Sequence, residues 1–248
     1  MDLNSDLGES FGAYSMGADA ELMPFITSAN IACGFHAGDP LVMDKTVALA
    51  QAHGVQVGAH PGYPDLAGFG RRALDATPTE VESMVLYQIG ALAAFTRAHG
   101  VALRHVKPHG ALYNVAARDI QVASAIVRAV ARFDSDLVLV GLTNSALIEA
   151  ARDLGLHTAR EGFCDRVYNA DGSLRSRREP GSVHDSPARA AAQAVQLARD
   201  HTVTTYEGTV ISLEVDTLCL HGDTPHAVEF ARAIYAALRE AGIEIKKL

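Results

Sequence analysis

Lys107 and His109 flank Pro108 and are followed by Gly110, directly after a short apolar segment of the chain. The sequence thus places an ammonium group and an imidazole directly after a predicted buried strand, beside a proline and a glycine that fix the backbone. An imidazole can transfer protons near neutral pH, and an ammonium group can stabilise an anionic oxygen. Packing alone explains this arrangement poorly, and it indicates a functional site.

Ionisable or hydrogen-bonding residues also follow most of the other short apolar segments. In chain order they are Asn4, Asp6 and Glu9; Cys33, His36 and Asp39; His60 and Asp65; Thr143 and Asn144; Glu161, Asp165 and Arg166; and His221 and Asp223. If the apolar segments are parallel strands, these residues share one rim, where the active sites of β/α proteins form. The turns at the opposite rim carry mainly glycine and apolar residues. This asymmetry predicts an enzyme.

A structural role stays open for several of these residues. Asp6 and Glu9 could cap a following helix, and a single histidine such as His60 or His109 is more often structural than functional. Asp6, His60 and His109 could also coordinate a divalent metal. No two of them are spaced as i and i+4 on a helix, so the sequence leaves a bound metal undetermined.

Arg71 and Arg72 follow a Gly-Phe-Gly segment at residues 68–70. Two guanidinium groups beside flexible backbone suit a carboxylate or a phosphate, although a solvated surface loop has the same composition. The sequence contains no GxxxxGKS/T nucleotide loop, no Gly-x-Ser-x-Gly elbow and no GxGxxG fingerprint after a strand. These absences disfavour nicotinamide redox chemistry and a simple serine hydrolase.

Composition excludes further classes of function. The 248 residues have a formal net charge of -8 with dispersed basic residues, which disfavours a nucleic-acid partner. No apolar run is long enough to span a membrane, and the polar, acidic N-terminus differs from a signal peptide, so we expect a cytoplasmic protein. Three widely spaced cysteines predict reduced thiols rather than a disulfide framework.

Two kinds of junction recur along the chain and predict where helices begin and end. Glycine closes an amphipathic stretch just before an apolar run, which predicts helix-to-strand turns at Gly54, Gly100, Gly155 and Gly242. A capping residue before proline predicts the start of a helix. Such pairs occur at Asp39-Pro40, Thr77-Pro78, Ser186-Pro187 and Thr224-Pro225.

Seven short segments rich in Val, Ile or Leu predict strands, at residues 1–5, 27–32, 56–59, 103–107, 137–142, 156–161 and 218–221. Because helical segments separate most of them, the sheet is expected to be parallel, either open or closed, and seven strands favour a closed barrel. We therefore predict an α/β protein with one β/α barrel domain over residues 1–248. A polar excursion at about 162–185 is expected to contain a hairpin at Asp171-Gly172 and to act as a lid or a partner contact.

Longer motifs run through essentially the whole chain. They are DLNSDLGE at 2–9, SANIACGFHAGDP at 28–40, GAHPGYPD at 58–65, GFGRR at 68–72, VKPHGALYN at 106–114, EGFCDRVY at 161–168 and CLHGD at 219–223. In this order they resemble the LamB/YcsF family, the A subunits of the bacterial ATP-dependent 5-oxoprolinase. The resemblance implies a seven-stranded barrel of the glycoside hydrolase/deacetylase type. It also implies cleavage of 5-oxoproline to L-glutamate, with ATP and Mg²⁺ as co-substrate and with subunits B and C as partners.

The resemblance gives the rim residues hypothetical roles. Asp6, His60 and His109 would handle the protons of the attacking water and the leaving nitrogen, and Lys107 would stabilise an anionic oxygen. The predicted substrate-binding residues are Asn4, His36, Arg71, Arg72, Glu161, Asp165, Arg166, His221 and Asp223. Two alternatives stay open, namely a metal-dependent carbohydrate or amide hydrolase of the deacetylase type and a non-catalytic subunit that positions the substrate.

Overall fold

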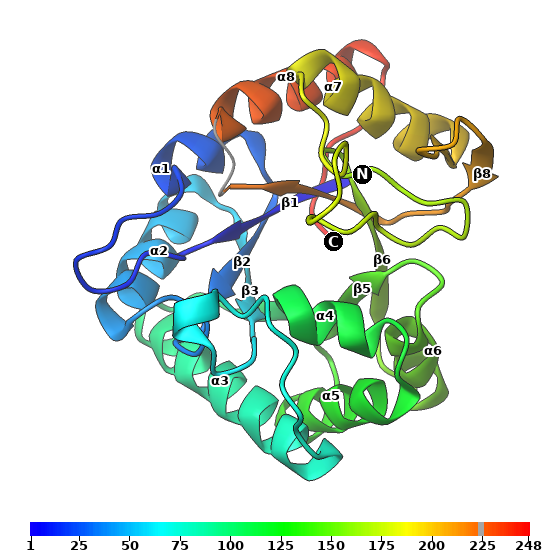
Figure 1. The fold of residues 1–248 in the computed structure, drawn as a ribbon. Coiled ribbons are helices and arrows are strands. Elements are labelled where there is room, and N and C mark those ends of the chain that lie inside the picture. The colour runs from blue at the N-terminus through cyan, green and yellow to red at the C-terminus, as the bar shows by residue number, and fades with distance from the viewer. Residues whose placement is uncertain (223–225) are drawn as a thin grey trace.

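Seven parallel strands close into a barrel in the computed structural model of the chain, which describes residues 1–222 and 226–248 (Figure 1). Around the barrel they are β1 (Asp2–Leu7), β2 (Ser28–Ala32), β3 (Gln56–His60), β4 (Leu103–Val106), β5 (Val138–Leu142), β6 (Thr158–Phe163) and β9 (Thr217–His221). Pairing of β9 with β1 closes the sheet. The predicted seven-stranded β/α barrel is confirmed, with each strand close to its expected position.

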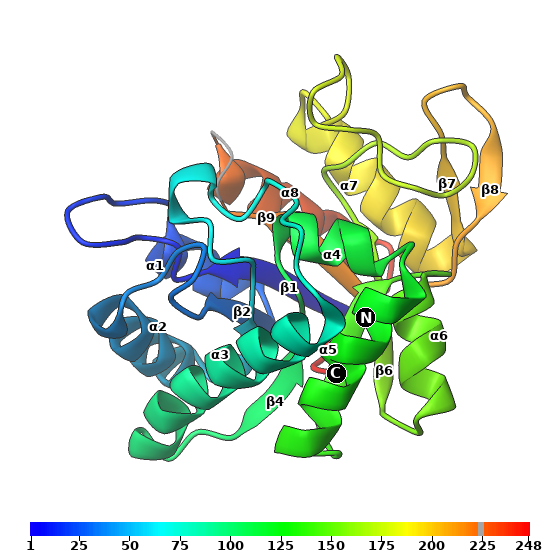
Figure 2. The same cartoon turned by 60° about the horizontal axis from the view of Figure 1, so that its bottom comes forward.

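Helices surround the outside of the barrel (Figures 1 and 2). The longer ones are α2 (Pro40–His53), α3 (Pro78–Ala98), α5 (Ile120–Phe133), α6 (Ala146–Asp153), α7 (Pro187–Val195) and α8 (Ala227–Glu240). The shorter elements are α1 (Asp19–Leu22), η1 (Met23–Phe25), η2 (Leu66–Gly68), α4 (Gly110–Ala116) and η3 (Gln196–Asp200). No helix in the described part of the chain combines the length and the apolar character that a bilayer crossing requires.

Side-chain caps confirm three of the four predicted helix starts. Asp39 accepts hydrogen bonds from backbone N–H groups at the start of α2, Thr77 forms a capping box at the start of α3, and Ser186 caps α7. These caps satisfy N–H groups that have no partner within their helix. The fourth predicted start, Thr224-Pro225, lies outside the described residues.

The prediction of a strand after Gly242 is wrong. Gly242 does end α8, with a φ of 74°, but residues 243–248 form no strand. Both edges of β1 are already paired, with β2 and with β9, so the closed barrel offers no edge to a further strand. The C-terminal segment instead crosses the start of the chain, where the Lys246 N–H donates to the Met1 carbonyl at 3.0 Å.

Polar side chains fill the inside of the barrel. Because successive strand residues point to opposite faces, Asp2, Asn4 and Asp6 of β1 point inward, whereas Leu3 and Leu7 join the apolar core beneath the helices. Most buried polar groups in proteins are hydrogen-bonded, and in this interior Asn30 donates to both Asn4 and Asp6, which joins the strands in a network. This network leads directly to the carboxyl ends of the strands.

His105 on β4 occupies the space beside Gly58 on β3. Its Nε2–H donates to Asn30 Oδ1 on β2 at 2.8 Å. Burial, together with the nearby Lys107, lowers the pKa of His105 to about 3, so the imidazole is neutral. A Cβ atom at position 58 would lie 2.1 Å from this ring, which is far inside van der Waals contact.

The polar excursion after β6 folds back on itself near the mouth of the barrel. An antiparallel bridge between Tyr168 and Leu174 forms the hairpin predicted around Asp171-Gly172. A second hairpin, made by β7 (Thr202–Thr204) and β8 (Val210–Ser212), lies near α7 and was not predicted (Figure 2). Strands of three residues are too short for an alternating apolar pattern to reveal them.

Replacement of Gly58 by alanine tests this interior packing. The new methyl group would overlap the His105 ring, so we expect the free energy of unfolding to fall by about 1–3 kcal/mol. Gly90→Ala is the matched control, because Gly90 is exposed within α3 and a Cβ atom added there would meet nothing within 4 Å. Urea unfolding of both variants measures the difference, and equal stabilities would contradict the tight fit.

Candidate active site

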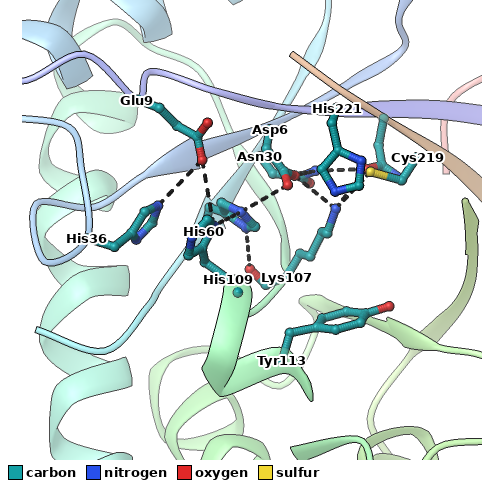
Figure 3. A network of polar contacts seen from close by, with 12 residues as sticks. Asp6, Glu9, Asn30, His36, His60, Lys107, His109, Tyr113, Cys219 and His221 are labelled. Carbon is teal, nitrogen blue, oxygen red and sulfur yellow. Dashed lines mark hydrogen bonds and ion pairs between the residues drawn. The ribbon is translucent and has the colours of Figure 1, made fainter. Parts of the chain in front are cut away.

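The carboxyl ends of the strands surround a cavity of about 500 Å³. Asp6, His60, Lys107 and His221 all line it, although they come from β1, β3, the end of β4 and β9 (Figure 3). Closure of the barrel thus brings together residues that are far apart along the chain, at the rim where the strand order predicts them. Tyr113, Phe163 and residues 174–178 of the excursion complete much of the lining.

A buried ammonium group lies at the centre of this arrangement. Lys107 Nζ lies 2.8 Å from Asp6 Oδ1 and 2.8 Å from Glu161 Oε1, and it also contacts Asn4 Oδ1 at 3.3 Å and Cys219 Sγ at 3.2 Å. Burial lowers the pKa of Lys107, but Asp6, Cys219 and Glu161 outweigh burial and raise this pKa well above its usual value. The side chain is therefore a fixed positive charge.

Asp6 is the negatively charged partner of that ammonium group. Its Oδ1 also accepts a hydrogen bond from Asn30 Nδ2 at 2.8 Å, and its Oδ2 lies 3.3 Å from His60 Nε2. Burial raises the pKa of Asp6, but His60 and Lys107 together hold it well below its ordinary value. The carboxylate stays ionised at neutral pH.

His60 and His109 face each other through one nitrogen each. His60 Nδ1 lies 2.7 Å from the Lys107 carbonyl oxygen, His109 Nε2 lies 2.9 Å from the Phe69 carbonyl oxygen, and His109 Nδ1 lies 3.0 Å from His60 Nε2. A carbonyl oxygen only accepts hydrogen bonds, so each ring donates its outer N–H to the backbone. Burial and the neighbouring His60 lower the pKa of His109 well below its usual value, so this ring is neutral.

His36 stacks on His109 with ring centroids 3.7 Å apart and planes within 4° of parallel. Glu9 Oε1 lies 3.7 Å from His36 Nε2 and 3.6 Å from His109 Nδ1. His36 is fully buried, and neither of its ring nitrogens has a hydrogen-bond partner among the described residues. Burial, assisted by His109 and His60, lowers the pKa of His36.

The structure separates the predicted substrate-binding residues into three groups. Arg71, Arg72, Arg166 and His221 line the cavity. Four others, Asn4, His36, Glu161 and Asp165, are buried and do not line it, so they contact the lining residues instead. For example, Asp165 Oδ2 lies 2.8 Å from His221 Nδ1. Asp223 lies outside the described residues.

The arginines at the cavity differ in the groups that they contact. The Arg72 guanidinium forms a short ion pair with Asp65, and Arg166 donates to the Ser182 and Arg175 carbonyl oxygens. These two arginines therefore help to hold loops in place. Arg71 lies over the Phe69 ring, with 4.8 Å between its guanidinium carbon and the ring centroid, at the wall of the cavity.

Several residues of the site were not among the predicted site residues. Asn30 donates to both Asn4 and Asp6, and the Tyr113 hydroxyl donates to Glu161 at 2.7 Å. Asn30 could have been found as a polar residue within a buried strand, and Tyr113 as an aromatic residue just after the histidine motif. The excursion adds a further group of cavity-lining basic residues, Arg175, Arg177 and Arg178.

Within residues 1–222 and 226–248, two groups of side chains could hold a metal ion. One comprises Glu9, His36, His60 and His109, and the other comprises Asp6, Cys219 and His221. The cavity as a whole combines an ionised carboxylate, an ammonium group and the neutral imidazole of His109 in a largely buried space. Such groups can polarise a carbonyl group and activate water.

Comparison with known proteins assigns the chain to a family. The model of the LamB/YcsF family matches residues 1–248. A protein of Tolumonas auensis, named as the A subunit of 5-oxoprolinase, is 54% identical over 248 residues, covering 100% of this chain and 99% of that protein. A protein of Pyrococcus furiosus with the same name is 52% identical, covering 99% of this chain and 96% of its own length.

Solved structures agree with this assignment. A crystal structure described as a lactam utilization protein from Thermus thermophilus has a TM-score of 0.95 and 48% sequence identity, covering 100% of this chain and 99% of that one. A putative cellobiose-phosphate cleavage protein from Enterococcus faecalis has a TM-score of 0.57 at 13% identity, covering 99% of this chain and 96% of that one, and shares the fold alone. This chain belongs to the LamB/YcsF family.

Proposed function

We propose that this chain is the A subunit of an ATP-dependent 5-oxoprolinase, which cleaves 5-oxoproline to L-glutamate together with subunits B and C. The names of relatives that are more than half identical over the full chain support this assignment. The observation that carries it is the buried set of Asp6, His60, Lys107 and His109 around one cavity. These groups suit the attack of water on a carbonyl group.

The proposed reaction begins with activation of an unreactive amide. 5-Oxoproline is a lactam, and amide resonance makes its carbonyl carbon a poor electrophile. Transfer of the terminal phosphoryl group of ATP to the carbonyl oxygen would create a better leaving group. Water then adds to this carbon, the C–N bond breaks as the nitrogen takes a proton, and a second water releases phosphate from the acyl phosphate. The products are L-glutamate, ADP and phosphate.

The charged groups of the cavity have complementary roles in this scheme. Lys107 stabilises negative charge on the substrate oxygen, because its ammonium group is fixed and largely shielded from water. Asp6 is ionised and His109 is neutral, so both can accept protons from attacking water. His60 contacts both of them and orients them toward the same space.

The basic residues at the wall of the cavity suit the anionic parts of the reactants. Arg71 and the excursion residues Arg175, Arg177 and Arg178 line the cavity and can bind the substrate carboxylate or a transferred phosphoryl group. The sequence has no GxxxxGKS/T loop, which favours partner subunits as the source of most contacts to ATP and Mg²⁺. We place the reaction in the cytoplasm, where ATP is available.

Reconstitution tests the proposed activity directly. We expect glutamate and phosphate to be released from 5-oxoproline and ATP only when this chain is combined with subunits B and C. Both products are measured for the chain alone, for B and C alone and for the mixture. Glutamate release by the chain alone without nucleotide would support a metal-dependent amide hydrolase instead. Full activity of B and C alone would show that the chain is dispensable.

Asp6→Asn tests the catalytic role of the buried carboxylate. The substitution nearly preserves shape but removes the charge next to Lys107 and His60, so kcat of the reconstituted complex should fall by about 10²- to 10⁴-fold. Asp44→Asn is the matched control, because Asp44 is paired with His99 on the outside of the barrel. Circular dichroism of both variants checks folding. A folded Asp6→Asn variant with wild-type kcat would rule out the role.

Arg71→Ala tests substrate binding at the wall of the cavity. In our proposal the Arg71 guanidinium binds the substrate carboxylate equally well in the ground state and in the transition state. Its loss should therefore raise KM for 5-oxoproline about 10-fold and leave kcat nearly unchanged. Arg128→Ala is the control, since Arg128 pairs with Glu82 between the outer helices. Steady-state kinetics separate the two constants, and an unchanged KM would exclude this contact.

A further inference from the structure

We propose that Glu9, His36, His60 and His109 form a binding site for one divalent transition-metal ion, and that Zn²⁺ fits this set of donors. One ligand atom from each of the four residues lies within 4.8 Å of the others, and all four residues are buried. Three imidazoles with one carboxylate are typical zinc ligands. The inference goes beyond the proposed reaction, because it rests on side-chain geometry and holds for any substrate.

The pair of facing histidine nitrogens offers two donor atoms to one cation. His60 Nδ1 and His109 Nε2 both point to backbone carbonyl oxygens and must carry their ring protons. With one proton on each ring, at these outer nitrogens, the two nitrogens that face each other, 3.0 Å apart, both carry lone pairs. Two lone pairs at this distance repel, whereas a cation bound by both nitrogens turns the contact into an attraction.

The distances from the Glu9 carboxylate to the two histidine nitrogens are too long for hydrogen bonds. They are close to the distances between two ligand atoms that bind the same ion. Glu9 Oε1 lies 3.6 Å from His109 Nδ1 and 3.7 Å from His36 Nε2, beyond hydrogen-bond length. Two ligands that are each about 2.1 Å from Zn²⁺ and roughly 110° apart lie roughly 3.4 Å from each other. The observed separations therefore leave space for an ion between these atoms.

His36 provides a separate reason for an ion. Its ring is completely buried, and within the described residues neither ring nitrogen has a hydrogen-bond partner. A buried polar group without a partner costs free energy, and in a folded protein it calls for an explanation such as an ion. Because Nε2 of His36 is directed toward Glu9, coordination would satisfy this nitrogen (Figure 3).

The surrounding structure fixes the ligands in the way that metal sites require. The four residues follow or end β1, β2, β3 and β4, so they converge from neighbouring strands. Backbone carbonyl groups hold the outer N–H groups of His60 and His109, which sets the tautomer and the orientation of each ring. At Gly70, a Cβ atom would lie 2.7 Å from His36 and 2.8 Å from His109, so the loop closes tightly over the rings.

The second group of candidate ligands is a weaker site. Lys107 Nζ lies 2.8 Å from Asp6 Oδ1 and 3.2 Å from Cys219 Sγ. An ammonium group therefore already supplies the positive charge that these two atoms need. A metal ion among Asp6, Cys219 and His221 would have to displace this group or be repelled by it.

An ion at the proposed site would act as a Lewis acid at the edge of the cavity, since His60, His109 and Glu9 all line it. The histidines and Asp6 would then have separate roles. In the metal-bound state the histidines would hold the ion, and His109 would no longer accept a proton. Asp6 would then be the proton acceptor, because its carboxylate contacts His60 but is not among the four ligands.

Zn²⁺ binding to the full chain tests the site without any activity assay. The purified protein is stripped with a chelator, dialysed and titrated with zinc sulfate by calorimetry, and the melting temperature is followed in parallel. We expect one ion per chain and a higher melting temperature, because a ligand that binds only the folded state stabilises it. Absence of binding, with no shift in melting temperature, would overturn the site.

Variants locate the bound ion. His36→Ala and Glu9→Gln should each weaken Zn²⁺ binding by about 100-fold or more, as expected for the loss of a ligand. His99→Ala is the matched control, because this histidine pairs with Asp44 away from the cavity. Circular dichroism checks that the apo variants are folded. Wild-type affinity in both folded variants would overturn the proposal.

X-ray absorption at the zinc edge of the wild-type protein gives a readout that needs no variant. The proposed ligands predict only nitrogen and oxygen neighbours, at about 2.0–2.1 Å, with the scattering pattern of imidazole. A sulfur neighbour at about 2.3 Å would place the ion at Cys219 and overturn the assignment. The reconstituted complex could bind zinc at the proposed ligands and still fail to cleave 5-oxoproline. That result would support the metal site and refute only the proposed function.

Discussion

The buried ion-pair network around Lys107 is the interaction on which the rest of the site depends. Its ammonium group joins Asp6 on β1 to Glu161 on β6, so strands from opposite parts of the sequence meet at one charge. Removing water from these ions costs several kcal/mol each, and only close, well-oriented partners offset that cost. The network is therefore compatible with a single arrangement of the strands, and that arrangement creates the cavity.

Closure of the barrel makes a polar interior tolerable. Asn30 connects Asn4, Asp6 and His105 by hydrogen bonds, so side chains from β1, β2 and β4 are joined inside the barrel. The close fit of His105 against Gly58 shows that this interior is as tightly packed as an apolar one. A rigid base of this kind holds the histidines and carboxylates above it in defined positions, which both acid–base catalysis and metal binding require.

The fold was predictable where local signals are strong. The seven strands and the caps at Asp39, Thr77 and Ser186 follow from apolar runs and capping chemistry within a few residues. The β7–β8 hairpin was missed because its strands are only three residues long. A strand was wrongly expected after Gly242, because the pattern of a helix end cannot show that the barrel is already closed.

By itself, the sequence determined which residue types gather at the active rim. Residues that follow parallel strands all lie at the same rim of the barrel, and this does not depend on which contacts they make there. Tertiary structure alone decided what each group does. It paired Arg72 with Asp65, buried Asn4 and Glu161 behind the cavity, and stacked His36 on His109 beside Glu9. The physical reason is that charge interactions and metal coordination depend on distances of a few ångströms and on burial. Those quantities are fixed only when strands from both ends of the chain meet.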